Sequence, residues 1–248
     1  MSTSEQAASH PDSSDRRTYI RRRGRMTRGQ ARALAMLQER YCIDPDAGLL
    51  DVPALFQRNA PLGLEIGFGM GHALLDWARE RPDWNLLGSE IYEPGVGAAL
   101  LGLQREGLDN VRLVAAPAEQ LLERQLACGA LDEVRIFFPD PWPKQRHHKR
   151  RLLQPQFVRT LTERMKVDAT LWVATDWEAY AEWIVAVLDA QPGLTRLAEP
   201  RVTDAATAAA AESVHGRPRT RFETRGIKLG HRTWDLRYVR NRSSTPSR

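Results

Sequence analysis

From about residue 61 onward, short apolar runs alternate with stretches in which apolar residues recur at helical spacing. The apolar runs predict strands, and the stretches between them predict helices. The expected strands are 62–66, 84–90, 111–115, 133–138 and 170–175, with 220–225 and 233–239 closing the sheet. The expected helices are 31–39, 73–80, 96–106, 118–127, 155–165 and 178–189. This alternation predicts an α/β fold, a doubly wound parallel sheet with helices on both faces.

The remainder of the chain suggests how the domain is bounded. We expect residues 1–17 to be a disordered N-terminal tail, residues 18–240 one domain with a basic N-terminal arm, and residues 241–248 a C-terminal tail. No apolar run is long enough to span a bilayer, and the polar N-terminus lacks the apolar stretch of a secretory signal. Cys42 and Cys128 match no metal-ligand spacing. We therefore expect a cytoplasmic monomer or homodimer with no membrane partner, no obligatory protein partner and no metal.

Positive charge is concentrated in three segments. Of the 36 Lys and Arg residues, 21 lie in segments 16–32, 144–151 and 217–240 beside only two acids, so these segments carry about +19. The rest of the chain carries about −14, which leaves a net charge of +5. Such clustering favours a polyanionic partner, namely nucleic acid. The alternative is that the arginines form solvated surface.

A glycine-rich loop follows the first expected strand and precedes a helix. It reads Glu65-Ile66-Gly67-Phe68-Gly69-Met70-Gly71. Glycines there let the backbone approach a ligand and expose the N–H groups at the start of the helix. A dinucleotide-binding loop would read G-x-G-x-x-G, but His72 takes the place of its third glycine. The observed E-x-G-x-G-x-G resembles motif I of the class I S-adenosylmethionine-dependent methyltransferases, whose leading acid contacts the methionine end of the cofactor.

Glu90 ends the second expected strand, 19 residues after Gly71. A carboxylate at this position can accept hydrogen bonds from both ribose hydroxyls of an adenosine. We expect Glu90 to bind the ribose, and its neighbour Ile91 to belong to the same cofactor site.

A rigid turn follows the fourth expected strand. Pro139 and Pro141 flank Asp140, and proline on both sides fixes an extended backbone. The turn presents one carboxylate beside the basic run 144–151. Trp142 lies between the two and is expected either to stack on a base or to pack within the turn.

Several unusual strings make the resemblance more specific. They are Gly24–Gln30 (GRMTRGQ), Glu90–Gly97 (EIYEPGVG), Phe137–Arg151 (FFPDPWPKQRHHKRR), Thr175–Trp177 (TDW) and Arg219–His231 (RTRFETRGIKLGH). Together they resemble the bacterial tRNA (guanine-N7)-methyltransferase family over about residues 18–240. The resemblance implies a Rossmann-like class I fold of seven mostly parallel strands with an antiparallel last strand. It also implies methyl transfer from S-adenosylmethionine to N7 of a guanine in the tRNA variable loop, at tRNA position 46.

The chemistry of guanine agrees with this implication. N7 is a lone-pair nucleophile without a proton, so its attack on a sulfonium methyl needs alignment and exclusion of water rather than prior deprotonation. The product is cationic, and Asp140 is our candidate for stabilising that charge, with a general base as the weaker version. Carboxylates also pair with guanine N1–H and N2–H₂, which makes Asp176 and Glu223 candidate readers of the base. The simpler alternatives are a helix N-cap for Asp176 and a cross-strand partner of arginines for Glu223.

The expected site residues fall into three groups. The cofactor-binding residues are Glu65, Gly67, Gly69, Gly71, Glu90, Ile91, Pro117, Ala118 and Asp140. The substrate-binding residues are Lys144, Asp176, Thr220, Arg221, Phe222 and Glu223. The residues expected to bind RNA phosphates are Arg146, His147, His148, Lys149, Arg150 and Arg151.

One position departs from the family pattern. Pro117 stands where the family has an acid that binds the adenine amino group, so backbone groups near Ala118, or the side chain of Glu119, must substitute. Two other functions remain as alternatives. An oxidoreductase of the same fold class would bind NADH and not S-adenosylhomocysteine. A non-catalytic RNA-binding protein with a decayed methyltransferase fold would transfer no methyl group.

Overall fold

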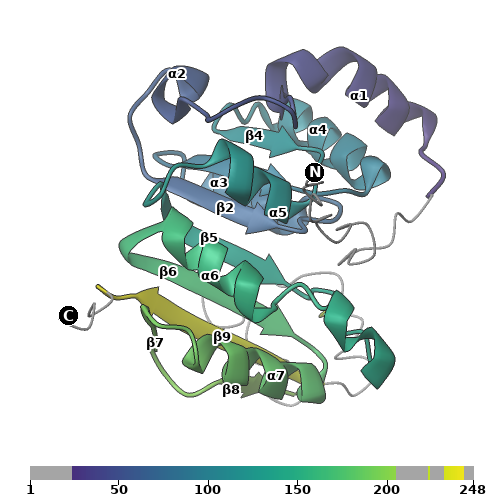
Figure 1. Ribbon diagram of the computed structural model, residues 1–248. Helices are drawn as coiled ribbons and strands as arrows, with labels where there is room; N and C mark the ends of the chain where they lie inside the picture. The colour runs from purple at the N-terminus through teal and green to yellow at the C-terminus, as the bar shows by residue number, and fades with distance from the viewer. Residues whose placement is uncertain (1–23, 205–222, 224–231, 243–248) are drawn as a thin grey trace, which may run out of the picture.

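A single mixed β-sheet runs through the middle of the protein, and helices cover both of its faces (Figure 1). The computed structural model describes residues 24–204, 223 and 232–242. The strands are β1 (Cys42–Ile43), β2 (Leu62–Ile66), β3 (Asn85–Ser89), β4 (Val111–Val114), β5 (Leu131–Phe137), β6 (Met165–Thr175), β7 (Leu194–Arg196), β8 (Arg201–Thr203) and β9 (Thr233–Arg240). The helices are α1 (Arg28–Tyr41), α2 (Val52–Phe56), α3 (His72–Glu80), α4 (Glu93–Glu106), α5 (Ala118–Gln120), the π-helical η2 (Leu121–Gln125), the 3₁₀-helical η3 (Gln145–Arg150), α6 (Pro155–Arg164) and α7 (Glu178–Asp189).

The strand order is β1-β4-β3-β2-β5-β6-β9-β7, and β8 pairs with β9. Strands β1 to β6 are parallel where they pair, whereas β9 is antiparallel to β6, β7 and β8. The doubly wound fold and the antiparallel last strand are therefore confirmed. Among the described residues the sheet has nine strands rather than the expected seven. Three of them, β1, β7 and β8, were not expected, because they are two or three residues long and too short to show a period of two.

Two hydrophobic clusters lie on opposite faces of the sheet. On one face α5, η2, α6 and α7 pack against β2, β5, β6 and β9. On the other face α1, α3 and α4 pack against β3 and β4. The central strands β2 and β3 are buried along their whole length because helices cover both faces.

Local sequence explains where several elements begin and end. Helix α1 starts three residues before the expected position, because Thr27 and Gln30 form a capping box in which each side chain accepts the other's backbone N–H at 3.2 and 2.8 Å. Helix α4 ends at Gly107, which has a φ of 65°. The expected strand 220–225 is wrong at Glu223, which is helical, and its other residues lie outside the described ones.

The start of α4 lies directly against the glycine loop. A Cβ added to Gly95 would be 2.1 Å from the carbonyl oxygen of Gly69, and one added to Gly71 would be 2.7 Å from the Cβ of Ala99. Glycine at 95 is thus required for the helix to approach the loop this closely. Within the described part of the chain, no helix is both long and apolar enough to cross a membrane.

We expect Gly95→Ala to destabilise the protein by about 1–3 kcal/mol, because the added methyl group collides with backbone that has little room to move. Gly48→Ala is the matched control, since a Cβ there has no neighbour within 4 Å. Urea unfolding of the two variants measures the difference. Equal free energies of unfolding would show that α4 does not constrain the loop.

Candidate active site

The expected cofactor residues gather at one edge of the sheet, where the parallel strands β2 to β6 end. Registered pairing aligns these ends, so the loops that follow the strands lie side by side. Gly67, Gly69 and Gly71 follow β2, Glu90 and Ile91 follow β3, Pro117 and Ala118 follow β4, Asp140 follows β5, and Asp176 follows β6. The structure thus brings together groups that are more than 100 residues apart in the chain.

The glycine loop has a backbone that other residues adopt with difficulty. Gly67, Gly69 and Gly71 have φ values of 73°, 55° and 83°. A Cβ at Gly67 or Gly69 would meet nothing within 4 Å, so the loop borders open space. Gly71 is the first residue before α3 and directs the N-terminus of that helix toward the same edge.

Glu90 ties two loops of this edge together. Its Oε2 accepts the N–H of Gly69 at 2.7 Å, and its Oε1 accepts those of Ile91 and Tyr92 at 2.7 and 2.9 Å. Burial raises the pKa of this carboxyl, and the three backbone hydrogen bonds act against that rise. The residue expected to bind a ribose therefore also sets the shape of the glycine loop.

Glu65 is buried at the head of the glycine loop, with an exposed fraction of 3%. Its Oε2 has no hydrogen-bond partner among the described residues. Burial raises the pKa of the carboxyl to about 8, although the positive charge of Arg135, its register partner on β5, opposes the rise. Such an orphaned buried oxygen is suited to a cationic ligand group.

Arg135 was not identified from the sequence. It is buried, its guanidinium carbon lies 3.8 Å from the ring centroid of Trp77 on α3, and its Nε donates to Glu133 at 2.6 Å. Its Nη1 also lacks a partner among the described residues. Arg135 shares its strand with Asp132 and Glu133, so its pattern in the sequence is that of a surface residue, and only the covering helix shows that it is internal.

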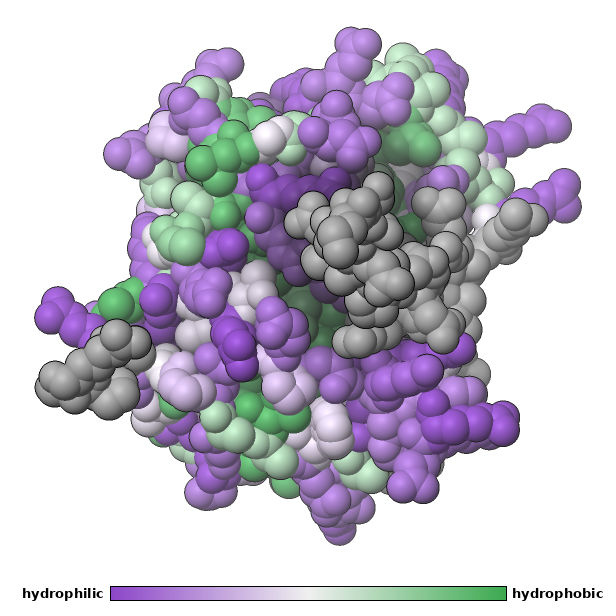
Figure 2. Space-filling model, viewed as in Figure 1, coloured by the Kyte–Doolittle hydropathy of each residue, from purple (hydrophilic) through white to green (hydrophobic). Residues whose placement is uncertain are grey.

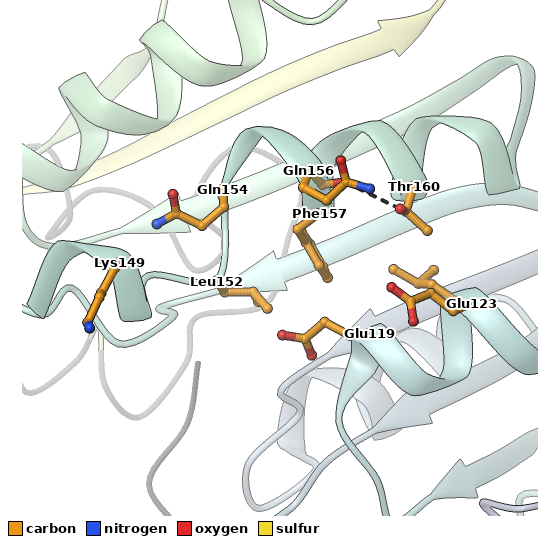
Figure 3. Close-up of a pocket in the computed structure, with 9 residues that line it drawn as sticks. Glu119, Glu123, Lys149, Leu152, Gln154, Gln156, Phe157 and Thr160 are labelled. Carbon is orange, nitrogen blue, oxygen red and sulfur yellow. Dashed lines mark hydrogen bonds between the residues drawn. The ribbon is translucent and has the colours of Figure 1, made fainter. Parts of the chain in front are cut away.

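The region expected to hold an adenine is built from backbone. Ser89 donates its hydroxyl to the carbonyl of Ala116 at 2.9 Å, which links the end of β3 to the loop after β4. Ala118 is buried, and Pro117 starts α5 with an extended backbone. Glu119, the alternative adenine partner, instead points toward a cavity of about 220 Å³ between η2 and α6 (Figure 3). No residue of the glycine loop lines that cavity.

The turn that carries Asp140 is strained on both sides. Phe138 and Trp142 have φ values of 53° and 45°, which cost roughly 1–3 kcal/mol each for such residues. Asp140 itself is exposed. Burial raises the pKa of both Glu90 and Tyr180, and the negative charge of Asp140 adds to the rise, so Asp140 lies within electrostatic reach of the β3 end and of α7.

The basic run forms η3 beside this turn, and Figure 2 shows strongly hydrophilic side chains over that element. The side chains of Lys144, Arg146 and Lys149 are exposed. Arg150 lies 5.2 Å from the ring centroid of Trp142, and the ring of His147 meets the same indole edge-on at 5.6 Å. Trp142 therefore packs within the turn, which is the second of the two roles expected for it.

Arg151 differs from the rest of the run in its surroundings. Its exposed fraction is 2%, and its Nε donates to the carbonyl of Pro141 at 2.9 Å. A guanidinium buried and engaged in this way is not available to a phosphate in solution.

The expected base readers lie near the end of β6 or beyond the described residues. Asp176 is partly buried and is not the N-cap of α7, since Trp177 occupies that position. Glu223 is fully buried, whereas Thr220, Arg221 and Phe222 lie outside the described residues. Trp177, which follows Asp176, is 42% exposed, a large fraction for a tryptophan side chain.

The N-terminal string reaches this edge as well. Gly24 packs against Tyr92, since a Cβ there would be 2.2 Å from the tyrosine hydroxyl oxygen. A Cβ added to Gly97 of α4 would lie 2.9 Å from the Cβ of Gln30 on α1. The strings Gly24–Gln30 and Glu90–Gly97, distant in sequence, are therefore in contact.

The chain is similar to known proteins along most of its length. Residues 59–236 match the family model described as "Putative methyltransferase". The chain is 48% identical over 224 residues to the tRNA (guanine-N(7)-)-methyltransferase of Acidovorax sp. (strain JS42), an alignment covering 90% of this chain and 86% of that protein. It is 47% identical over 224 residues to the protein of the same name from Nitrosococcus oceani, with 90% of each chain covered.

Solved structures share the fold at low sequence identity. The 16S rRNA methyltransferase KamB superposes with a TM-score of 0.55 at 16% identity, covering 79% of this chain and 96% of that one. The 16S rRNA (adenine(1408)-N(1))-methyltransferase from Catenulisporales acidiphilia gives a TM-score of 0.51 at 18% identity, covering 80% and 97%. At such identities the likeness establishes the fold alone.

The buried Glu65 carboxyl predicts how stability depends on pH. Its pKa is about 8 in the folded protein and near 4.5 when unfolded, so within that window the folded protein holds a proton that the unfolded chain has released. The free energy of unfolding of the ligand-free protein therefore falls as pH rises from 4.5 to 8. We expect Glu65→Gln to remove this loss and to be more stable than wild type at pH 8 by on the order of 2 kcal/mol, with little difference at pH 5.

Urea unfolding at the two pH values measures this effect. Glu106→Gln is the control, because the hydrogen bond from Arg105 lowers the pKa of Glu106 and its removal gives no gain at pH 8. Parallel pH profiles for wild type and Glu65→Gln would contradict the assignment.

Proposed function

We propose that this protein transfers a methyl group from S-adenosylmethionine to N7 of a guanine in tRNA. The chain belongs to the bacterial tRNA (guanine-N7)-methyltransferase family. The product is N7-methylguanosine, and we place the target in the variable loop, at tRNA position 46. One observation supports the proposal most strongly. The glycine loop, Glu90 and the Asp140 turn lie at one edge of the sheet, beside an exposed basic element. The family excludes the oxidoreductase alternative.

The edge fits the proposed cofactor at its methionine and ribose ends. Glu65 has a buried oxygen without a partner, which suits the α-ammonium of the methionine part. Gly67 and Gly69 leave open space beside a backbone that only glycine adopts readily. Of the roughly four lone-pair sites of the Glu90 carboxylate, three accept backbone N–H groups, and the remaining site on Oε2 can accept a ribose hydroxyl. When bound, S-adenosylmethionine supplies an electrophilic methyl group.

The adenine end depends on backbone groups and on Ile91. Pro117 offers no N–H and no carboxylate, and Glu119 points into the separate cavity beside α6. We propose that Ala118, whose N–H stands at the start of α5, contributes to holding the ring.

Asp140 is the proposed electrostatic partner of the acceptor base. Guanine becomes cationic as N7 gains the methyl group, and a carboxylate fixed nearby stabilises that charge as it develops. The proline-flanked turn holds this carboxylate without a large change of conformation on binding. Because N7 carries no proton, no general base is needed.

Recognition of the base and of the RNA backbone is divided between two groups of residues. We propose that Asp176 and Glu223 accept the N1–H and N2–H₂ donors of guanine, together with the segment Thr220–Phe222. Lys144, Arg146, Lys149 and Arg150 are proposed to contact phosphates, with His147 and His148 beside them. As tRNA is a cytoplasmic substrate, we propose that the protein acts in the cytoplasm, with residues 18–240 as the methyltransferase domain.

Methyl transfer to two matched tRNA transcripts tests this function. One transcript carries guanine at position 46, and the other carries 7-deazaguanine there, which lacks only the proposed acceptor atom. We expect incorporation of labelled methyl from S-adenosylmethionine into the first and none into the second. Equal incorporation would move the target to another atom, and no incorporation into any tRNA would favour the non-catalytic RNA-binding alternative.

We expect Asp140→Asn to lower kcat by about 10²-fold, since a neutral amide of the same shape cannot stabilise the developing positive charge. Binding of S-adenosylhomocysteine, measured by calorimetry, is expected to change by less than about threefold, because Asp140 is exposed to solvent and its replacement by the isosteric asparagine leaves the shape of the turn unchanged. A kcat equal to that of the wild type would remove Asp140 from the mechanism.

A further inference from the structure

Arg151 differs from every other basic residue of its run. Lys144, Arg146 and Lys149 are exposed, whereas the side chain of Arg151 is almost fully buried between the Asp140 turn and α7. Burial lowers the pKa of its guanidinium, and the described residues provide no carboxylate salt-bridge partner for it. A buried cation without an ion pair requires compensation from hydrogen bonds and aromatic faces.

The contacts of Arg151 connect three elements. Its Nε donates to the carbonyl oxygen of Pro141 at 2.9 Å, and its Nη2 lies 3.1 Å from Nε2 of His148. Its guanidinium carbon lies 4.9 Å from the ring centroid of Tyr180 and 5.4 Å from that of Trp183, both on α7. The guanidinium thus bridges the residue after Asp140 to the helix that begins just beyond Asp176.

The turn needs such an external restraint. Phe138 and Trp142 on either side of it have positive φ values, a conformation that persists only where the surroundings impose it. A hydrogen bond from a charged donor is about twice as strong as one from a neutral donor. The guanidinium of Arg151 therefore gives the Pro141 carbonyl a strong partner within the turn.

We propose that Arg151 is a positioning residue of the methyl transfer: its guanidinium, seated on Tyr180 and Trp183, holds the Pro141 carbonyl and thereby fixes the Asp140 carboxylate relative to α7 and Asp176. This inference rests on the proposed function. In this role Arg151 acts on the base through the turn rather than by direct contact with cofactor or RNA. A displacement of about 1 Å in a catalytic group can cost about 10²-fold in rate, so loss of this restraint is sufficient to reduce turnover.

The conservative change Arg151→Lys separates positioning from phosphate binding. Lysine keeps the positive charge, but it lacks the planar group that donates to Pro141 while stacking on two rings. We expect kcat to fall by about 10- to 100-fold, with the KM for tRNA and the salt dependence of tRNA binding unchanged. Lys149→Gln, at an exposed position of the same element, is expected to do the reverse, raising the KM for tRNA and reducing the salt slope.

A double-mutant cycle with Asp140→Asn measures the coupling of the two residues in kcat, which a merely structural role of Arg151 would not produce. If Arg151 acts through Asp140, Arg151→Lys will lower kcat strongly in the wild type and by less than about threefold in the Asp140→Asn background. Arg151→Gln, which buries no charge, gives the same cycle should the lysine variant fail to fold. Folding is checked by the melting temperature and by binding of S-adenosylhomocysteine.

The outcomes distinguish this inference from the function on which it rests. Absence of methyl transfer by the wild-type protein would overturn the proposed function. Three results would overturn the positioning role while leaving the function intact. They are a kcat that Arg151→Lys leaves unchanged, an equal effect of Arg151→Lys in both backgrounds, and a salt slope of tRNA binding reduced as in Lys149→Gln.

Discussion

The carboxylate of Glu90 is the constraint on which the ligand-binding edge depends. By accepting the N–H groups of Gly69, Ile91 and Tyr92, it fixes the loops after β2 and β3 against each other. Without this carboxylate, those N–H groups would have to be satisfied by water or by the ligand. The close approach of Gly95 to Gly69 allows this arrangement by bringing α4 onto the loop.

The same edge contains two features that cost free energy of folding in the ligand-free protein. Glu65 has a buried oxygen without a partner, and the Asp140 turn has two residues with positive φ. Each costs free energy of folding, which a fold tolerates where a ligand or a reaction gains from it. Arg151 stabilises the second of these features, and a cationic ligand group would stabilise the first. The site is therefore organised before ligand binding, which is what in-line methyl transfer requires.

Much of the fold could be predicted from the sequence, because the central elements have simple patterns. β2 and α7 have the expected bounds, and the other central strands differ by a few residues. The short strands β1, β7 and β8 could not be predicted, since two or three residues carry no periodicity. The helical state of Glu223 was missed because the threonines and Phe222 around it give the segment 220–225 the composition of a strand.

The sequence allowed us to predict which residues lie at the candidate site, but not the surroundings of every one of them. The glycine loop, Glu90 and Asp140 meet at one edge because parallel strands align their ends, a rule that needs only the strand order. Arg151 has the same residue type as its exposed neighbours, and only the packing of α7 distinguishes it. Arg135 is a similar case, since its role depends on the register that places it beside Glu65.

The central claim is that this protein forms N7-methylguanosine in tRNA. The most direct measurement is the mapping of N7-methylguanosine in total tRNA from a strain that lacks the gene and from the same strain with the gene restored. The account predicts that the modification in the variable loop is absent from the first tRNA pool and present in the second. Unchanged modification at that position in the deletion strain would contradict it.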